Sequence, residues 1–269
     1  MTLDISPPPE LLSCTSLVSP FTSQTPVSGW KNPQAIKPWH TEYSLVFVVD
    51  KVANKLLLGL KKRGMGFGLY NGYGGKPEQG ESMQDCAIRE LYEESGLTVA
   101  EQDIYYKGLL LSSRPKARES LDTYLLSIHI YACMSWLGNP KETEEMAPKW
   151  FTMETLPIQK MWPEARLYLP AILDSILHDM DKENLLFARV DYEYLTATDA
   201  PTSFPPLQGT SIRFETDSID NDVNQDSLQE RLSGWWMAFV PRQILSKSSP
   251  LTRLIEFEET RKSCYRNSP

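Results

Sequence analysis

Continuous apolar runs along the chain predict a series of buried β-strands. A run of about four to eight apolar residues between turn residues is typical of a strand that is covered on both faces. Such runs lie at residues 43–50 and 55–60, and residues 104–111, 123–133, 149–151, 185–195 and 209–215 are also predicted to form strands. Between the third and fourth of them, residues 112–119 are polar and basic, which predicts a loop.

Two segments have the residue spacing of a helix rather than that of a strand. The first follows Ser82, which stands three residues before Asp85 as in a helix-capping box, and it ends at Gly96, a typical C-terminal stop. The second spans residues 164–178, where apolar residues recur with a helical period.

The distribution of proline and charge divides the chain into three parts. Residues 1–40 are rich in Pro, Ser and Thr and carry few charges, so we expect a disordered or loosely docked arm. Residues 41–217 hold the predicted strands and helices and form the predicted domain. Residues 218–269 form a C-terminal extension that opens with an acidic linker. Within this extension, the apolar run 234–240 is expected to pack on the domain or on a partner, because paired exposed tryptophans are unfavourable.

Composition and charge exclude several classes of partner. The chain has 269 residues, of which 41% are hydrophobic, so it can form a core. The net charge of −8, from 27 basic and 35 acidic residues, argues against binding of a nucleic-acid polymer. No apolar run reaches the roughly 18–20 residues that a membrane span needs. With four cysteines in no metal-binding spacing and no secretory or transit signal, a cytoplasmic location is expected.

The glycine-rich loop and the helix after it, within residues 72–97, carry the strongest chemical signal. Glu90 and Glu94 are four residues apart and Glu93 lies beside them, so three carboxylates share one helical face. A bound cation relieves the repulsion between such groups, and oxygen ligands favour Mg²⁺ or Mn²⁺. The simpler interpretation, a solvated acidic helix face, leaves Arg89 and the glycine loop unexplained.

Residues 75–97 fill every fixed position of the pattern G-x5-E-x7-R-E-L-x-E-E-x-G-L and resemble the Nudix box. Residues 56–64, 71–76, 145–151 and 161–163 resemble one branch of the family, the animal MutT homologues, which are oxidised purine nucleoside triphosphatases. The resemblance implies an α/β fold, the Nudix α/β/α sandwich with a mixed sheet. It also implies a metal-dependent attack of water on a nucleoside triphosphate such as 8-oxo-dGTP. That reaction yields a monophosphate and pyrophosphate, and so removes damaged nucleotides from the pool.

The same resemblance implies roles for individual residues. The implied metal ligands, for Mg²⁺ or alternatively Mn²⁺, are Gly74, Gly75, Glu90, Glu93, Glu94 and Glu145. Glu93 or Glu94 would help to deprotonate water, and Arg89 would orient the glutamates. The implied substrate-binding residues are Lys61, Met65, Tyr70, Asn71, Trp162 and Glu164. Ala165 follows Glu164, where this branch has a second acidic residue.

The residues leave two other functions open. One is hydrolysis of a non-nucleotide diphosphate, such as an isoprenyl or sugar diphosphate. The other is a catalytically weak ligand-binding module in which the arm and the extension serve as interaction segments. A small molecule is the expected partner of the site in each case, and the C-terminal extension is a candidate contact for a protein.

Overall fold

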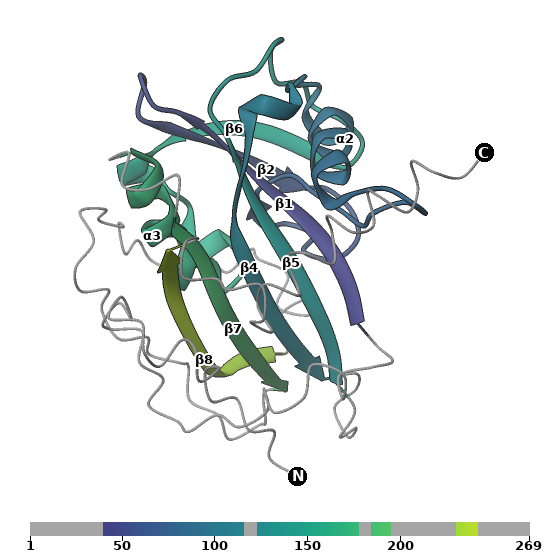
Figure 1. Cartoon of the computed structure of the whole chain (residues 1–269), viewed down its shortest axis with the longest axis vertical. Coiled ribbons are helices and arrows are strands. Elements are labelled where there is room, and N and C mark those ends of the chain that lie inside the picture. The colour runs from purple at the N-terminus through teal and green to yellow at the C-terminus, as the bar shows by residue number, and fades with distance from the viewer. Residues whose placement is uncertain (1–39, 116–122, 178–183, 195–229, 242–269) are drawn as a thin grey trace.

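The structure is a computed structural model that describes residues 40–115, 123–177, 184–194 and 230–241 (Figure 1). The strands are β1 (His40–Asp50), β2 (Lys55–Lys61), β3 (Tyr70–Asn71), β4 (Ile104–Pro115), β5 (Thr123–Cys133), β6 (Met146–Thr152), β7 (Asn184–Tyr194) and β8 (Glu230–Pro241). The helices are α2 (Met83–Ser95) and α3 (Ala165–Leu177), and short 3₁₀ turns span η2 (Glu101–Asp103), η3 (Met153–Thr155) and η4 (Ile158–Lys160). The predicted strand at residues 209–215 and nearly all of the N-terminal arm lie outside the described residues.

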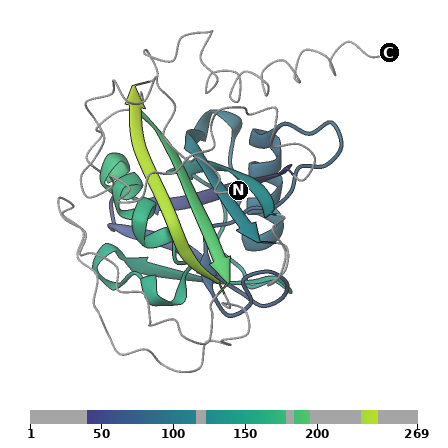
Figure 2. The same ribbon diagram turned by 90° about the horizontal axis from the view of Figure 1, so that it is seen from below.

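The described strands form one mixed sheet. Its order is β3-β2-β1-β5-β4-β7-β8, and β6 pairs separately with β2. The pairs β1–β5 and β4–β7 are parallel, whereas the remaining pairs are antiparallel. The long antiparallel pair β7–β8 forms one edge of this sheet (Figures 1 and 2).

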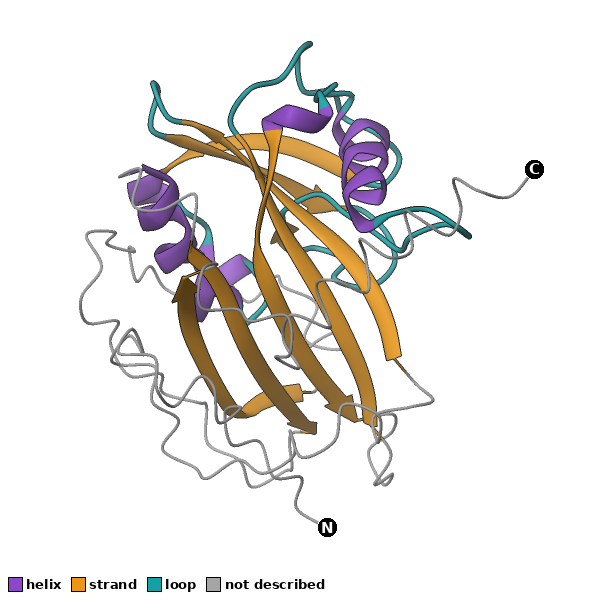
Figure 3. Cartoon of the chain, viewed as in Figure 1, coloured by secondary structure: helices purple, strands orange, loops and turns teal. Residues whose placement is uncertain are grey.

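The two helices cover opposite faces of the sheet. Because successive residues of a strand point to opposite faces, Val46 and Val48 of β1 join the core cluster beneath α2, whereas Phe47 and Val49 join the cluster beneath α3. The separation of the two helices is visible in Figure 3. This arrangement confirms the predicted α/β/α sandwich with a mixed sheet. None of the helices in the described part of the chain is long and apolar enough to cross a membrane.

Helix α2 begins and ends where its sequence predicts. The Ser82 hydroxyl oxygen accepts a hydrogen bond from the backbone N–H of Asp85 at 3.1 Å, which satisfies a donor of the first turn. At the other end Gly96 has a φ of 74° and its N–H donates to the carbonyl of Tyr92, as in a left-handed C-cap. These caps hold the helix, and therefore its glutamates, at a defined position beside the sheet.

Strand β4 extends beyond its predicted end at residue 111. Residues 112–115, predicted as the start of a loop, pair with β5 on one side, and residues 112–113 also pair with β7 on the other. Backbone hydrogen bonds from both neighbours outweigh the polar composition of this segment. As a result Arg114 belongs to the sheet.

Strand β8 comes from the segment that the sequence assigned to a separate extension. It pairs with β7 along the whole length of that strand, from Asn184 with Pro241 to Tyr194 with Glu230. The side chains of Leu232 and Met237 are buried in the core cluster beneath α3. The sheet of the domain therefore includes residues well beyond the predicted boundary at residue 217.

Candidate active site

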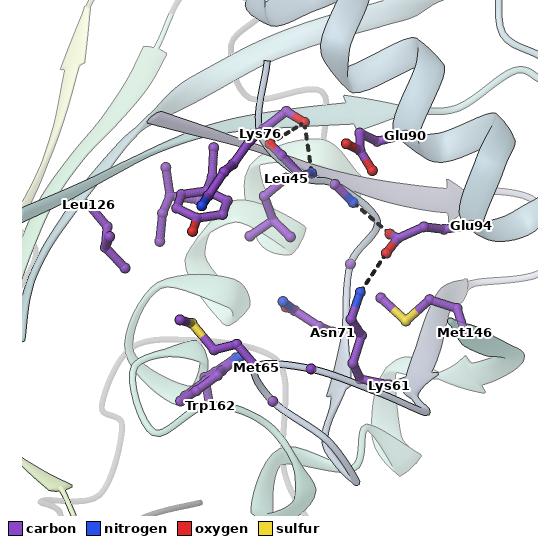
Figure 4. Close-up of a pocket in the computed structure, with 18 of the residues that line it drawn as sticks. Leu45, Lys61, Met65, Asn71, Lys76, Glu90, Glu94, Leu126, Met146 and Trp162 are labelled. Atoms are coloured by element: carbon purple, nitrogen blue, oxygen red, sulfur yellow. Dashed lines mark hydrogen bonds and ion pairs between the residues drawn. The ribbon is translucent and has the colours of Figure 1, made fainter. Parts of the chain in front are cut away.

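A cavity of about 670 Å³ opens between the glycine-rich loop, α2 and the first turn of α3. Its volume lies within the range of about 300–1,000 Å³ that is typical of small-molecule sites. The predicted site residues that line it are Lys61, Met65, Asn71, Gly74, Gly75, Glu90, Glu93, Glu94, Glu145, Trp162 and Glu164. Figure 4 shows Glu90 and Glu94 on one side of the cavity, Trp162 and Met65 on the other, and Asn71 between them.

The glycine-rich loop brings its backbone against the carboxylates. The N–H of Gly74 donates to Glu94 Oε2 at 2.9 Å, and the N–H of Gly75 donates to the Ser44 hydroxyl at 3.3 Å. A Cβ at Gly74 would collide with the Ser44 carbonyl, and a Cβ at Gly75 would collide with the Glu90 carboxylate. Only glycine permits this approach, which explains the residue type at both positions.

Lys61 neutralises the most buried glutamate of the cluster. Its Nζ lies 2.8 Å from Glu94 Oε1 and 3.1 Å from Glu145 Oε2, so it bridges α2 and the segment before β6. Burial raises the pKa of the Glu94 carboxyl above its ordinary value, and the nearby Lys61 only partly opposes that effect. The side chain of Glu94 is only 4% exposed. A buried carboxylate at this position needs a cation beside it.

Arg89 organises the remaining carboxylates of the helix. Its guanidinium makes a two-pronged contact with Glu81, at 2.8 Å and 2.9 Å. It also donates to Glu90 and to Glu93, each at 3.0 Å. Glu90 is largely buried, and this burial raises the pKa of its carboxyl. The side chain of Glu93 is 54% exposed. Arg89 itself does not line the cavity, so its geometry suits orientation of the glutamates.

The oxygen ligands at the carboxylate end of the cavity suit a hard divalent cation. Carboxylate oxygens from α2 and from Glu145 meet the backbone of the glycine loop, and such oxygens are the ligands that Mg²⁺ prefers. Within the described ranges no three acidic, histidine or cysteine side chains converge closely enough to form a metal cluster. In the present arrangement the positive charge beside these carboxylates comes from Lys61, Arg63 and Arg89.

Tyr70 is the predicted binding residue that the structure places elsewhere. Its ring packs edge-on against Phe151, with the ring centroids 5.0 Å apart, and it does not line the cavity. Neighbouring residues of a strand point to opposite sides. Asn71 therefore faces the cavity, while the preceding Tyr70 faces the core.

Sequence reasoning missed Arg114, which stands at the Trp162 end of the cavity. Its guanidinium donates to Glu230 Oε2 at 2.8 Å and lies 3.3 Å from Glu164 Oε1. Tyr192 also donates from its hydroxyl to Glu164. The signal that could have found Arg114 is the period of two along β4, because Leu110, four residues earlier, also lines the cavity.

A family model and two sequence relatives agree on the family of the chain. A model of the NUDIX domain matches residues 43–172. The oxidized purine nucleoside triphosphate hydrolase of Danio rerio is 40% identical over 132 residues, which are 49% of this chain and 79% of that protein. The protein of the same name from Mus musculus is 38% identical over 133 residues, 49% of this chain and 80% of that protein. A crystal structure of a MutT protein from Bacillus halodurans has a TM-score of 0.45 and 21% identity, over 57% of this chain and 90% of that chain.

Proposed function

The chain belongs to the Nudix family of hydrolases, and from this premise we propose that it hydrolyses oxidised or otherwise modified purine nucleoside triphosphates with the help of Mg²⁺. Water adds to phosphorus, the bond to the bridging oxygen breaks, and the products are a nucleoside monophosphate, pyrophosphate and a proton. The names of the zebrafish and mouse relatives support this substrate class.

The observation that carries the proposal is the division of one cavity into two chemically different ends. One end presents Glu90, Glu93 and Glu94 beside the bare backbone of the glycine loop, which suits a polyphosphate and its cation. The other end presents the Trp162 indole with hydrogen-bonding groups near it, which suits a planar base. A nucleoside triphosphate has both chemistries at its two ends.

At the carboxylate end, the glutamates of α2, Glu145 and the backbone of Gly74 and Gly75 would hold Mg²⁺, with Mn²⁺ as the alternative. Bound there, the metal would neutralise phosphate charge and lower the pKa of the attacking water. Lys61, which pairs with Glu94 and Glu145, would contact the phosphate chain. Neutralising the phosphates is the main requirement of phosphoryl chemistry, because charge repels the nucleophile.

The protein groups that handle the proton are Glu93 and Glu94. A carboxylate that accepts the proton of water must keep a lone pair directed at that water, and Arg89 fixes Glu93 by an ion pair at 3.0 Å. Glu94 is held by Lys61 and by the N–H of Gly74. Both glutamates are therefore oriented before substrate arrives.

A hydrolysis screen with Mg²⁺ tests the proposal. The panel contains 8-oxo-dGTP and other purine triphosphates, nucleotide sugars and prenyl diphosphates, and each is tested again after chelation of the metal. We expect turnover of the purine triphosphates that chelation abolishes and that Glu93→Gln and Glu94→Gln reduce by at least about a hundredfold. Turnover of the non-nucleotides alone would overturn the substrate assignment. Turnover that survives chelation would overturn the metal requirement.

A further inference from the structure

Arg114 is an ion-paired cation inside a cavity whose catalytic end it does not reach. It lies on β4, it is 12% exposed, and its partners Glu164 and Glu230 are 5% and 19% exposed. Desolvation works against its charge, but the two carboxylates and Tyr192 outweigh that cost and raise the pKa of the guanidinium. Arg114 is therefore charged and fixed in place. Its partners come from the residue before α3 and from the first residue of β8.

Two aromatic rings determine the position of the guanidinium. The Cζ atom of Arg114 lies 3.9 Å from the centroid of the Tyr192 ring and 4.5 Å from that of Trp162. A Cβ added to Gly66 would come within 3.1 Å of the same indole, so Gly66 closes in on Trp162 as well. A planar cation held by stacking and by two carboxylates is preorganised, which strengthens any hydrogen bond that it makes to a ligand.

The charge of this cluster favours a neutral ligand group. One arginine and two glutamates leave a net charge of −1, because Tyr192 donates only a hydrogen bond to Glu164 and is itself neutral. A phosphate would be repelled there, and Figure 4 places Trp162, on which Arg114 stacks, across the cavity from Glu90 and Glu94. The uncharged base of a nucleotide meets no such repulsion.

The Arg114 guanidinium supplies most of the hydrogen-bond donors in this cluster. The two oxygens of Glu164 already accept from Arg114 and from Tyr192. A guanidinium has five N–H donors and no acceptor, and the contacts with Glu164 and Glu230 are its hydrogen bonds to described residues. A base that enters this end of the cavity therefore meets donors, and an arginine fork matches the adjacent O6 and N7 acceptors of a 6-oxopurine.

We propose that Arg114 is a specificity-determining residue that donates to the O6 edge of the base, so that the enzyme selects 6-oxopurine over 6-aminopurine nucleotides. The inference rests on the proposed function and names the part of the substrate that this cluster recognises. A 6-amino group is itself a hydrogen-bond donor, so it leaves N–H groups of the guanidinium without an acceptor. The complex with a 6-aminopurine nucleotide is therefore weaker.

The test compares dITP with dATP, which differ only at C6 and in the N1 proton. For the wild-type enzyme we expect kcat/KM to favour dITP by about tenfold to a hundredfold, which is the usual discrimination of a good arginine–base contact. Arg114→Met keeps the length of the side chain and removes its donors. This variant should lose most of the preference, because its kcat/KM for dITP should fall much further than its kcat/KM for dATP. Binding of dIMP and dAMP, measured by calorimetry, should show the same gap and the same loss.

A second variant keeps the test decisive if Arg114→Met fails to fold. Arg114→Lys retains the charge between Glu164 and Glu230 but lacks the planar fork, so the dITP preference should fall severalfold. If the variant that folds has the wild-type dITP/dATP ratio of kcat/KM, the inference is overturned and the proposed function stays intact. An equal fall of kcat/KM on both substrates has the same meaning. A wild-type enzyme that does not prefer dITP also overturns it. Absence of turnover on every purine triphosphate overturns the proposed function and the inference together.

Discussion

At the scale of single residues, the carboxylate cluster depends on two cations with different tasks. Arg89 contacts three glutamates near the surface of α2 and fixes their directions. Lys61 instead stands against Glu94, whose burial already raises the pKa of that carboxyl. Removing Lys61 therefore leaves a buried charge without its partner, whereas removing an exposed lysine does not.

Replacing Lys61 with methionine should lower the free energy of unfolding by about 2–3 kcal/mol when divalent metal is absent. The loss should shrink as the pH falls, because a carboxyl whose folded pKa is raised costs stability only where it is ionised, that is, towards higher pH. Added Mg²⁺ should restore more stability to Lys61→Met than to the wild-type protein, since the metal replaces the missing cation. Urea unfolding with chelator and with Mg²⁺, at neutral and at acid pH, measures each effect.

Lys62→Met is the matched control for this experiment. Lys62 also pairs with a glutamate, Glu142, at 2.7 Å, but both side chains are exposed. Exposed ion pairs contribute little to stability, so we expect the free energy of unfolding to change by less than about 0.5 kcal/mol, with no added response to Mg²⁺. Equal losses in the two variants would show that the Lys61–Glu94 pair has no special role.

At the scale of elements, local signals and long-range pairing differ in how far the sequence reveals them. Helix α2 was predicted correctly because its start, its end and its apolar face are all encoded within about four turns of one segment. The short strand β3 and the last residues of β4 were missed, because they are strands by virtue of their pairing with neighbouring strands and not of their own composition. Composition describes a segment, but backbone pairing depends on its neighbours.

The N-cap of α2 gives a prediction at the same scale. Ser82→Ala removes the hydroxyl that accepts from the Asp85 N–H, so we expect the free energy of unfolding to fall by about 1 kcal/mol. Ser82→Thr keeps a hydroxyl that accepts from this N–H and donates to the Asp85 carboxylate, so its stability should match the wild-type value within about 0.5 kcal/mol. Hydrolysis should persist in both variants, because Glu90 and Glu94 lie beyond the first turn. A stable Ser82→Ala variant in denaturant titrations would argue against the cap.

At the scale of the whole molecule, the two ends of the cavity were not equally predictable. The carboxylate end is encoded largely in one loop and one helix, so its residues stand together in the sequence. The other end assembles Arg114 from β4, Glu164 before α3, Tyr192 from β7 and Glu230 from β8. No spacing rule joins residues that are up to 116 positions apart. Alternation along β4 indicates the face to which Arg114 points, but the order of strands in the sheet is what brings its partners beside it.

Strand β8 gives the prediction that concerns the whole molecule. A chain that ends at residue 217 loses the partner of β7, which becomes an exposed sheet edge prone to aggregation. It also loses the burial of Leu232 and Met237, worth roughly 3–6 kcal/mol together, and the ion pair between Arg114 and Glu230. We therefore expect this truncated protein to be insoluble or to melt well below the full chain.

Two further variants separate the contribution of β8 as a paired strand from the contribution of the Glu230 carboxylate. A chain that ends at residue 241 keeps all of β8 and should melt at least 5 °C above the chain that ends at residue 217, since about 1 kcal/mol shifts the melting temperature of a domain this size by roughly 2–4 °C.

Glu230→Gln in the full chain keeps the strand but removes one carboxylate from Arg114. Because the Glu164 contact remains, this protein should fold while the position of the guanidinium loosens and the dITP preference declines. Calorimetric melting and the dITP/dATP ratio read these two effects separately. A chain that ends at residue 217 and still melts and discriminates like the full protein would show that β8 contributes neither stability nor specificity.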